Sequence, residues 1–555
     1  MLRLIPLCLA LVVVSAGAPS PRRCDRLFLG GLVHTPAGVR RVGIAVGAGR
    51  ILALVEPDQA EGWRKAATEV VVLGGAHVYP GFTESHGHLT GYGAALEQVD
   101  LRATASFDEV IERVRKAARR LPAGAWVVGR GWDQNLWPER SFPTQQKLTA
   151  AVPERPALLR RVDGHAVLLN ARALTVAGIT AATPDPPGGR ILRDGSGAPT
   201  GVLVDDAVEL VEKVVPPPTA ADIKRRVLLA ARRLAEFGIT EIHDPGTSRA
   251  ELAVLRKLQH DKRLPVRVYV MLDGGDDTLL ATELPHGPWR SEDGMLTVRA
   301  VKLYADGALG SRGAWLSAPY HDDPTTRGLE VTPVERLREV VRRCADAGFQ
   351  PAIHAIGDAA VTRVLDVYEH ELGPRSAALR PRMEHAQVVR PADVPRFAAL
   401  GVIASVQPTH CTSDMPWAPA RLGEDRIAWA YRWRSLLNAG ARLCLGSDVP
   451  VESPDPRLGM WAAVTRRPPQ GTRPTLASPP EVLTFEEALA GYTSWAAFAG
   501  FEEDLRGTIA IGLAADLTVL DRDLGAGAPA AILQARVLRA IVAGRDSFVA
   551  GSETR

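Results

Sequence analysis

The sequence predicts an α/β protein: a (β/α)8 TIM-type barrel, a small β-sandwich domain built from both chain ends, and a large insertion after barrel strand 1. Three observations predict this fold. The middle of the chain alternates short apolar strands with Ala-, Leu- and Arg-rich helical segments, which is typical of parallel βα units. Both ends instead carry short β-rich runs separated by Gly turns. A gap of about 150 residues between the first two barrel strands is too long for a loop and predicts an inserted subdomain.

Eight barrel strands can be assigned from the apolar runs, with helices between them, for example at 221–237 and 334–347. The expected strands are residues 78–82, 239–243, 266–271, 298–305, 350–354, 382–385, 402–406 and 443–446. The expected domains are a small β domain at 19–78 and 505–555, a barrel at 79–504, and an insertion at 91–220 within it. In such barrels the chemistry lies at the carboxyl ends of the strands, so those positions are the ones to inspect.

The composition excludes several classes of protein. Apolar residues make up 46% of the 555 residues, which excludes general disorder. Basic and acidic residues number 66 and 63, so the net charge of +3 indicates no nucleic-acid partner and no anionic membrane surface. Five cysteines without a CxxC pair exclude a disulfide scaffold and a Cys-rich zinc module. Only 8 lysines accompany 58 arginines, so a lysine in an apolar strand stands out.

Residues 1–18 have the pattern of a signal peptide. Arg3 supplies a positive start, residues 4–14 form an apolar run, and residues 16–18 are small enough for cleavage. The run is shorter than the roughly 20 residues that cross a bilayer, so we expect no stable membrane insertion. We expect export to the periplasm or the extracellular space; the alternative is an uncleaved, disordered start.

Two histidines follow the first expected barrel strand in the motif PGFTESHGHL at 80–89. Alternate residues of an extended segment point the same way, so His86 and His88 can both face the barrel mouth. Imidazoles at this spacing can hold one divalent ion. The motif alone is a weak signal, and its position at the end of a strand strengthens it.

Four further residues fall at the ends of later expected strands. They are Lys302 in VRAVKLYADG, His354 in QPAIHAIGD, His385 in RMEHAQ and Asp448 in LCLGSD. Taken singly, each is more often a polar group satisfied at a strand end than a ligand. Taken together with the His pair, and in this order, they predict a metal centre at the mouth of the barrel.

The pattern resembles the amidohydrolase superfamily, in which HxH follows strand one, Lys strand four, His strands five and six, and Asp strand eight. More narrowly it resembles the amidohydrolase family 3 branch that contains N-substituted formamide deformylases. The motifs that carry this likeness are GWDQNLW at 131–137, RRVDGHAVLLN at 160–170, KLYADGALGSR at 302–312, HAIGDAA at 354–360, MEHAQ at 383–387, GSDVPVESPDP at 446–456 and LRGTIAIGLAADLTVLD at 505–521. The resemblance covers nearly everything after residue 18. It names the substrate poorly, because one fold and one metal cage serve many hydrolyses.

The resemblance implies two divalent ions, usually zinc, and six residues that hold them. One ion would be bound by His86, His88 and Asp448, the other by His354 and His385, with carboxylated Lys302 bridging the two. The CO2-derived carbamate on Lys302 would offset the charge of the ions, whereas an ammonium group would add to it. Asp448 would take a proton from the metal-activated water and pass it to the leaving nitrogen.

Other polar residues are candidates for the substrate pocket or for supporting contacts. Trp132, Asp133 and His165 lie in the insertion and could line the pocket; an internal hydrogen-bond network of the insertion is the alternative. Asp306 and His410 are pocket candidates near later strand ends. Supporting contacts are expected from Glu384, Gln407, His243 and Asp244, and buried thiols from Cys411 and Cys444.

We therefore expect a metal-dependent amidohydrolase that cleaves a non-peptide carbon–nitrogen bond, an amide or formamide, in a small-molecule substrate. A homodimer is a possible assembly. Two alternatives stay open: an ester or lactone hydrolase on the same metals, and a metal-free exported binding protein that kept the barrel. The complete set of six ligand-type residues argues against the binding protein, which needs no such cage.

Overall fold

The computed structural model describes residues 23–122, 124–161, 166–186, 189–469 and 481–552. The expected signal peptide, residues 1–18, lies outside the described residues. The chain divides into two compact units. As far as they are described, unit 1 comprises Met1–Gly87, Arg232–Ser248 and Lys262–Arg555, and unit 2 comprises His88–Ala231 and Arg249–Asp261.

The centre of unit 1 is a sheet of eight parallel strands, which confirms the predicted barrel. In sheet order they are β8 (Phe82–Glu84), β15 (Ile239–Thr247), β16 (Arg267–Asp273), β18 (Leu296–Tyr304), β19 (Gln350–Ala355), β20 (Arg382–His385), β21 (Ile403–Val406) and β22 (Arg442–Leu445). The backbone N–H of Ser85 donates to the carbonyl of Leu445 over 3.3 Å and joins the first strand to the last. The sheet is therefore nearly closed.

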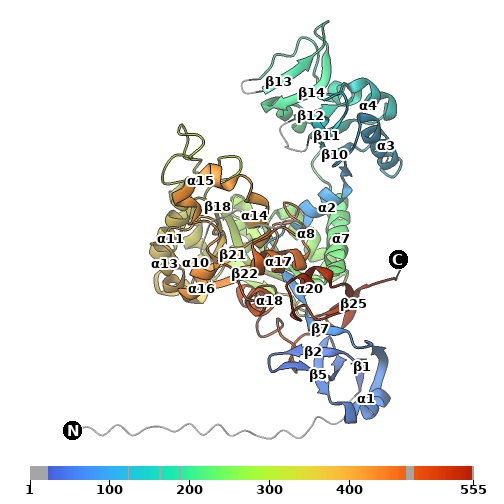
Figure 1. Cartoon of the computed structure of the whole chain (residues 1–555), viewed down its shortest axis with the longest axis vertical. Helices are drawn as coiled ribbons and strands as arrows, with labels where there is room; N and C mark the ends of the chain where they lie inside the picture. Colours follow the sequence, from blue (N-terminus) through green and yellow to red (C-terminus); the bar gives the residue numbers. More distant parts are fainter. Residues whose placement is uncertain (1–22, 123, 162–165, 187–188, 470–480, 553–555) are drawn as a thin grey trace, which may run out of the picture. The chain divides into compact units, whose positions relative to one another are not determined.

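Helices surround the barrel strands, as Figure 1 shows for α10 (Val334–Ala347), α11 (Asp358–Leu372), α13 (Val394–Leu400) and α16 (Trp433–Asn438). The expected helices at 221–237 and 334–347 correspond to α7 (Ala220–Glu236) and α10. Further helices of unit 1 are α9 (Asp277–Glu283), α14 (Pro408–Asp414), α15 (Ala418–Ile427), α17 (Pro456–Thr465), α18 (Phe485–Gly491) and α19 (Ser494–Ala499). Across the described part of the chain, no helix is both long and apolar enough to span a bilayer.

The first barrel strand differs from its prediction. The sequence predicted one strand at 78–82, but two short strands occupy this region: β7 (His77–Pro80) and β8. The chain passes from one sheet to the other at Gly81, whose N–H donates to the carbonyl of Asp516 over 2.9 Å. A Cβ atom at Gly81 would lie 2.2 Å from the Thr240 hydroxyl oxygen, so only glycine fits this crossing.

Two further sheets in unit 1 form a small β sandwich, built from strands at both ends of the chain. One contains β5 (Arg50–Val55), β4 (Gly43–Gly47), β1 (Cys24–Leu29) and β6 (Ala67–Val72). The other contains, in order, β25 (Arg545–Val549), β24 (Val537–Val542), β23 (Leu517–Leu520), β7, β2 (Leu32–Thr35) and β3 (Gly38–Arg40). Phe28 and Ile44 of the first sheet share a buried core with Val78 and Val519 of the second. The predicted sandwich of both chain ends is thereby confirmed.

A buried ion pair joins the sandwich to the barrel. Arg267, the first residue of β16, donates from Nε and Nη2 to the two carboxylate oxygens of Asp516 over 2.6 and 3.0 Å. Both side chains are almost fully buried. Close by in the sequence, the hydroxyl of Thr518 on β23 donates to the carbonyl of Gly238, just before β15. The sandwich is thus attached at the amino ends of barrel strands.

The predicted insertion, residues 91–220, falls within unit 2 as far as it is described, and this unit has a hydrophobic core of its own. Its sheet contains β13 (Gly189–Arg193), β14 (Pro199–Asp205), β12 (Ala166–Leu169), β11 (Ala157–Arg161), β10 (Val127–Trp132) and β9 (Val99–Asp100). Its helices include α2 (Leu89–Glu97), α3 (Phe107–Ala118), α4 (Gln145–Ala151), α5 (Ala171–Val176) and α8 (Arg249–His260). Val110 of α3 and Leu159 of β11 belong to one buried cluster. The apolar face of α3 thus packs on this sheet.

Candidate metal centre

Five of the six predicted ligand residues lie in unit 1 at the carboxyl ends of its parallel strands. Lys302 lies near the end of β18, His354 near the end of β19, and His385 is the last residue of β20. His86 and Asp448 follow β8 and β22 within three residues. This edge is where barrel folds carry their chemistry. His88 is the first residue of unit 2 and is half-buried.

The His86 ring is fixed by a carboxylate. Its Nδ1 donates to Oε2 of Glu384 over 2.5 Å, so the lone pair lies on Nε2. Nε2 faces Nζ of Lys302 at 3.5 Å and Oδ1 of Asp448 at 3.6 Å. Burial, reinforced by the nearby Lys302, lowers the pKa of His86 to about 4. The imidazole is therefore neutral at physiological pH, which is the form that binds a metal ion.

Arg382, which the sequence analysis missed, holds Glu384 in place. The guanidinium donates to the two Glu384 oxygens over 2.7 and 3.1 Å, and also contacts Nδ1 of His243 at 2.8 Å. Burial alone would raise the Glu384 pKa, but Arg382 and His86 hold it well below its ordinary value. An arginine two residues before Glu384 in a short strand that is buried throughout is the signal that could have revealed it.

Glu84 is a second residue that the sequence analysis missed. Its carboxylate accepts hydrogen bonds from the N–H and hydroxyl of Ser447, each over 2.7 Å, and from the N–H of His86 over 3.1 Å. These bonds tie the segment after β8 to the segment after β22. Burial raises the Glu84 pKa to about 8 against these hydrogen bonds. A carboxylate two residues before His86, inside a buried strand, was the available signal.

His385 and His410 lie together at the barrel mouth. Nδ1 of His385 donates to Oε1 of Gln407 over 2.8 Å, which confines its lone pair to Nε2. The His410 ring lies parallel to it, with an interplanar angle of 11° and centroids 6.0 Å apart. His385, His410 and Asp448 each offer a ligand atom, and these three atoms lie within 4.8 Å of one another. Nε2 of His410 has no hydrogen-bond partner among the described residues.

The backbone is strained where two of these residues emerge. His385 has a φ of 74° and Asp448 a φ of 59°, in the left-handed region that side-chain-bearing residues rarely adopt. Such conformations persist only where the surrounding structure enforces them, and they gather at functional sites. Here they aim the two side chains at the barrel mouth.

His354 and Asp306 form the opposite side of the cluster. The His354 ring meets the His385 ring edge-on, with centroids 4.5 Å apart, and its Nε2 lies 3.4 Å from Oδ1 of Asp306. Asp306 accepts three backbone hydrogen bonds, from Trp315, Ile356 and Gly357, over 2.7 to 3.0 Å. Asp306 therefore braces the loops after β18 and β19. Burial raises its pKa to about 7 despite these hydrogen bonds.

Lys302 is 1% exposed and faces the histidines. Its ammonium lies 4.5 Å from the centre of the Tyr304 ring, in addition to its contact with His86. Burial lowers the Lys302 pKa to about 8. A lowered pKa increases the share of the neutral amine, which is the form that can react with CO2.

The donor set fits a divalent ion. Neutral imidazoles, a carboxylate and a buried lysine converge on one mouth, and two of the rings are oriented by hydrogen bonds to their remote nitrogens. Imidazole and carboxylate together suit Zn2+ and its first-row neighbours.

The insertion candidates are used inside unit 2 or lie outside the described residues. Trp132 is 1% exposed; its indole N–H donates to the carbonyl of Leu159 over 2.7 Å, and its ring stacks on Trp137. Asp133 pairs with Arg161 at 3.1 Å. His165 lies outside the described residues. The Trp132 contacts match the alternative of an internal network, and a role of the insertion in substrate binding stays a prediction.

Comparison with known proteins shows the family of the chain. The model of the amidohydrolase family matches residues 69–548, so the chain belongs to the amidohydrolase family. It is 34% identical over 484 residues to the putative amidohydrolase YtcJ of Bacillus subtilis, covering 86% of this chain and 90% of that protein. It is 30% identical over 514 residues to the N-substituted formamide deformylase of Arthrobacter pascens, covering 90% and 94%.

A solved structure has the same fold. The crystal structure of an uncharacterized metal-dependent hydrolase from Pyrococcus furiosus aligns with a TM-score of 0.76 and 31% identity, over 90% of this chain and 100% of that one. The predicted superfamily and branch are confirmed, and the chain is a hydrolase of a family that acts on small molecules.

Proposed function

We propose that this protein hydrolyses a non-peptide carbon–nitrogen bond, an amide or formamide, in a small molecule. The observation that carries the proposal is the orientation of His86, whose Nε2 faces Lys302 and Asp448 while Glu384 holds its other nitrogen. This arrangement suits a ligand to a metal ion that activates water. The printed name of the deformylase relative, which covers 90% of this chain, supports the bond type.

We further propose that the site takes two divalent ions, with zinc as the metal. His86, His88 and Asp448 would bind one ion, His354 and His385 the other, and carboxylated Lys302 would bridge them. The buried Lys302 amine beside His86 supports the carbamate, because an ammonium group at this place would oppose bound cations. We also propose that His410, whose ring lies parallel to that of His385, contacts the substrate.

The ions, when bound, would polarise the scissile carbonyl and lower the pKa of a water molecule. Residues of the chain would transfer the proton and orient the metal ligands. Asp448 would accept the proton of the attacking water and deliver it to the leaving nitrogen. Glu384 and Gln407 would keep His86 and His385 in the tautomers that present Nε2.

A substrate panel tests the bond type. Purified protein supplied with Zn2+ is assayed on N-formyl amines, N-acyl amides, cyclic amides, esters and lactones, with Asp448→Asn as the matched control. Turnover of N-formyl or amide substrates that stops on chelation and in Asp448→Asn is the expected result. Turnover confined to esters or lactones would contradict the proposed bond, and binding without any hydrolysis would indicate the metal-free binding protein.

We also propose that residues 1–18 direct export. The charged start, apolar run and small residues at 16–18 support it. N-terminal sequencing of protein recovered from a bacterial periplasm or medium should begin a few residues after position 18, and an intact Met1 on all recovered protein would contradict it.

A further inference from the structure

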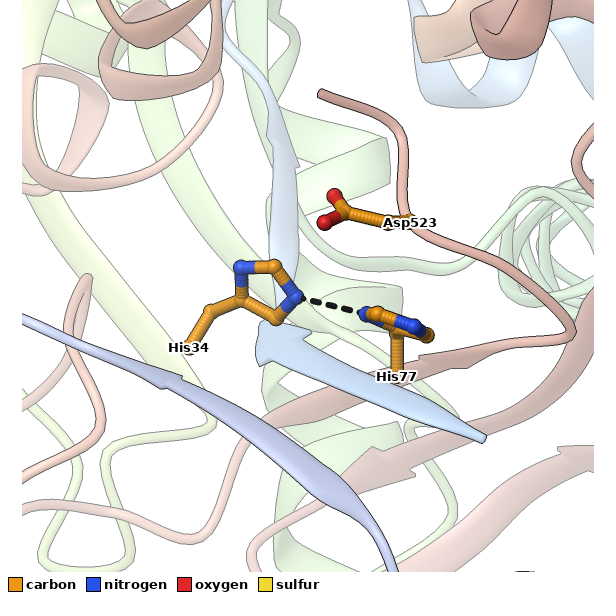
Figure 2. Close-up of side chains that lie close together, drawn as sticks. All are labelled: His34, His77 and Asp523. Carbon is orange, nitrogen blue, oxygen red and sulfur yellow. Dashed lines mark hydrogen bonds between the residues drawn. The ribbon is translucent and has the colours of Figure 1, made fainter. Parts of the chain in front are cut away.

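A second cluster of metal-ligand residues lies in the sandwich. His34 belongs to β2, His77 is the first residue of β7, and Asp523 follows β23 by three residues. Nε2 of His34 and Nδ1 of His77 lie 3.0 Å apart. The two imidazoles and the carboxylate offer ligand atoms that all lie within 4.8 Å of one another. Figure 2 shows one nitrogen of the His34 ring pointing at a nitrogen of the His77 ring, with the Asp523 carboxylate nearby.

The strand register explains why these residues meet. β2 runs parallel to β7 with Leu32 opposite His77 and Val33 opposite Val78, so His34 lies two residues further along than Leu32, beside Tyr79. The His34 ring stacks on the Tyr79 ring, with centroids 3.8 Å apart and an interplanar angle of 19°. Leu520 of β23 lies opposite His77, and Asp523 comes three residues later. Three strands of one sheet thus bring together two histidines and one carboxylate.

The cluster is separate from the barrel mouth. Val33 and Val78 face the sandwich core, so His34 and His77, their neighbours in alternation, lie on the other face of the sheet. That face also carries Thr518, which contacts Gly238 at the amino end of β15. The candidate catalytic residues lie at the carboxyl ends of the barrel strands. The His34, His77 and Asp523 cluster therefore lies in the sandwich, on the side of the amino ends of the barrel strands, and the candidate catalytic residues lie on the opposite side.

We propose that His34, His77 and Asp523 bind a divalent transition-metal ion, with Zn2+ as the ion they suit best. Two imidazole nitrogens on one tetrahedral zinc ion, at bond lengths near 2.05 Å, are separated by about 3.3 Å. The observed separation of 3.0 Å needs only a small opening of the pair. Imidazole with carboxylate is a donor set that zinc, copper and nickel share.

The Asp523 carboxylate is held as a ligand would be. Its Oδ1 accepts from the Tyr79 hydroxyl over 2.7 Å and from the Gly525 N–H over 2.9 Å. These bonds use one oxygen and orient the other, in the way that outer hydrogen bonds orient metal ligands. All three candidate ligands are half-buried, so an ion can reach them from solvent.

The ion would act as a cross-link rather than as a catalyst. It would connect His34 and His77, on strands near the start of the chain, to Asp523 after β23. Asp523 lies 444 positions from Tyr79 in the sequence. Binding to the folded state alone raises its stability by mass action. The proposal is independent of the proposed hydrolysis, because none of its residues belongs to the barrel mouth.

The test is metal content and Zn2+-dependent melting of the full-length protein. His34→Gln and Asp523→Asn should each bind one Zn2+ fewer per chain than wild type, and should lose most of the rise in Tm on adding Zn2+, with unchanged hydrolysis. His286→Gln, at an exposed histidine outside the cluster, is the matched control and should behave as wild type. Asp523→Asn keeps the side-chain shape, so it covers the case in which His34→Gln fails to fold.

A graded variant distinguishes metal binding from packing. Tyr79→Phe removes the hydroxyl that orients Asp523 but no ligand, so it should keep the stoichiometry at saturating Zn2+ and weaken affinity by about 10- to 100-fold. Lys302→Ala should keep the Zn2+-dependent rise in Tm while losing hydrolysis, which separates this ion from those at the barrel mouth. Equal Zn2+ content and equal Tm response in wild type, His34→Gln and Asp523→Asn would overturn the proposal.

Discussion

Nδ1 of His86 lies 2.5 Å from Oε2 of Glu384, and this contact decides which imidazole nitrogen faces the barrel mouth. Glu384 is itself held by Arg382 from the same strand, so three buried residues act in series. The orientation of a candidate ligand thus depends on a guanidinium that never reaches the mouth.

Glu384→Gln should weaken metal binding at the barrel mouth. The amide oxygen can still accept a hydrogen bond from Nδ1 of His86, but it lacks the negative charge that makes the ring a stronger ligand. Metal affinity or activity should therefore fall by about 10- to 100-fold. Zn2+ titration together with kcat/KM checks this. Glu371→Gln, which disturbs a Glu–Arg contact on α11 outside the site, is the control for a simple loss of an ion pair. Equal Zn2+ affinity in both variants would contradict the orienting role.

His86→Ala and His88→Ala should abolish hydrolysis and lower the metal content while the protein stays folded. The physical reason is that a ligand holds the ion, whereas the barrel is built by the strands. Metal analysis, turnover and circular dichroism of the purified variants check the three parts. His260→Ala, at an exposed histidine, is the control. Full activity in either histidine variant would remove that residue from the ligand set.

Lys302→Ala should lose hydrolysis and at least one ion, because the proposed bridge disappears. Propionate added to this variant should restore part of both, since a small carboxylate can occupy the space that the side chain leaves. Lys302→Arg should stay inactive, because a guanidinium keeps its charge and cannot react with CO2. Electron density that shows an unmodified Lys302 amine at high resolution would rule out the bridge. So would two bound ions and normal turnover in Lys302→Ala.

Asp516→Ala should destabilise the protein by about 3–5 kcal/mol, the cost of leaving a buried charge without its partner. The charge left behind is that of Arg267, which is almost completely buried. Chemical denaturation followed by circular dichroism measures the change. Asp277→Ala breaks exposed arginine pairs on the surface and should cost less than about 1 kcal/mol. Similar losses in both variants would contradict the assigned role.

Glu502 should give the stability a specific pH dependence. Burial, opposed by the Thr297 hydrogen bond, raises its pKa from 4.5 to about 7. The folded state then holds the proton more tightly than the unfolded state, so the free energy of unfolding falls as pH rises between these two values. Glu502→Gln imitates the protonated form. Its Tm relative to wild type should therefore rise from about pH 5 to about pH 8.

Glu503→Gln is the matched control for this experiment. Its neighbour Arg380 holds the Glu503 pKa below its ordinary value despite partial burial, so no relative gain in Tm is expected in the same pH range. A constant Tm difference between Glu502→Gln and wild type across that range would mean that Glu502 does not titrate there.

The barrel could be predicted because each strand is a short apolar run with its own polar end. Lys302 and His385 were visible for this reason: one is out of place in its strand, and the other closes its strand. The split of residues 77–84 into two strands could not be predicted, because it depends on Gly81 fitting against Thr240, far away in the sequence. Contacts made only in three dimensions leave no local pattern.

Glu384, Gln407 and His243 were expected to support the site, but their partners in space could not be predicted. The sequence places Arg382 beside Glu384 but says nothing of the His86 ring, 298 positions from Glu384, that completes the series. Trp132 is a residue type that often lines pockets. Only the structure reveals that its indole N–H donates to Leu159 inside unit 2. The pairing of His34 with His77 requires the register of β2 on β7, which hydrophobic alternation alone does not fix.

The central position of β7 in its sheet has a consequence for how the protein is made. β7 lies between β2, which ends at Thr35, 42 positions before His77, and β23, whose Leu517 pairs with Pro80. During synthesis the amino-terminal strands emerge first, and one edge of β7 must wait for almost the whole chain to be translated. An unpaired edge strand attracts other chains. A fragment ending before Leu517 should therefore aggregate, and the nascent protein should depend on chaperones late in translation.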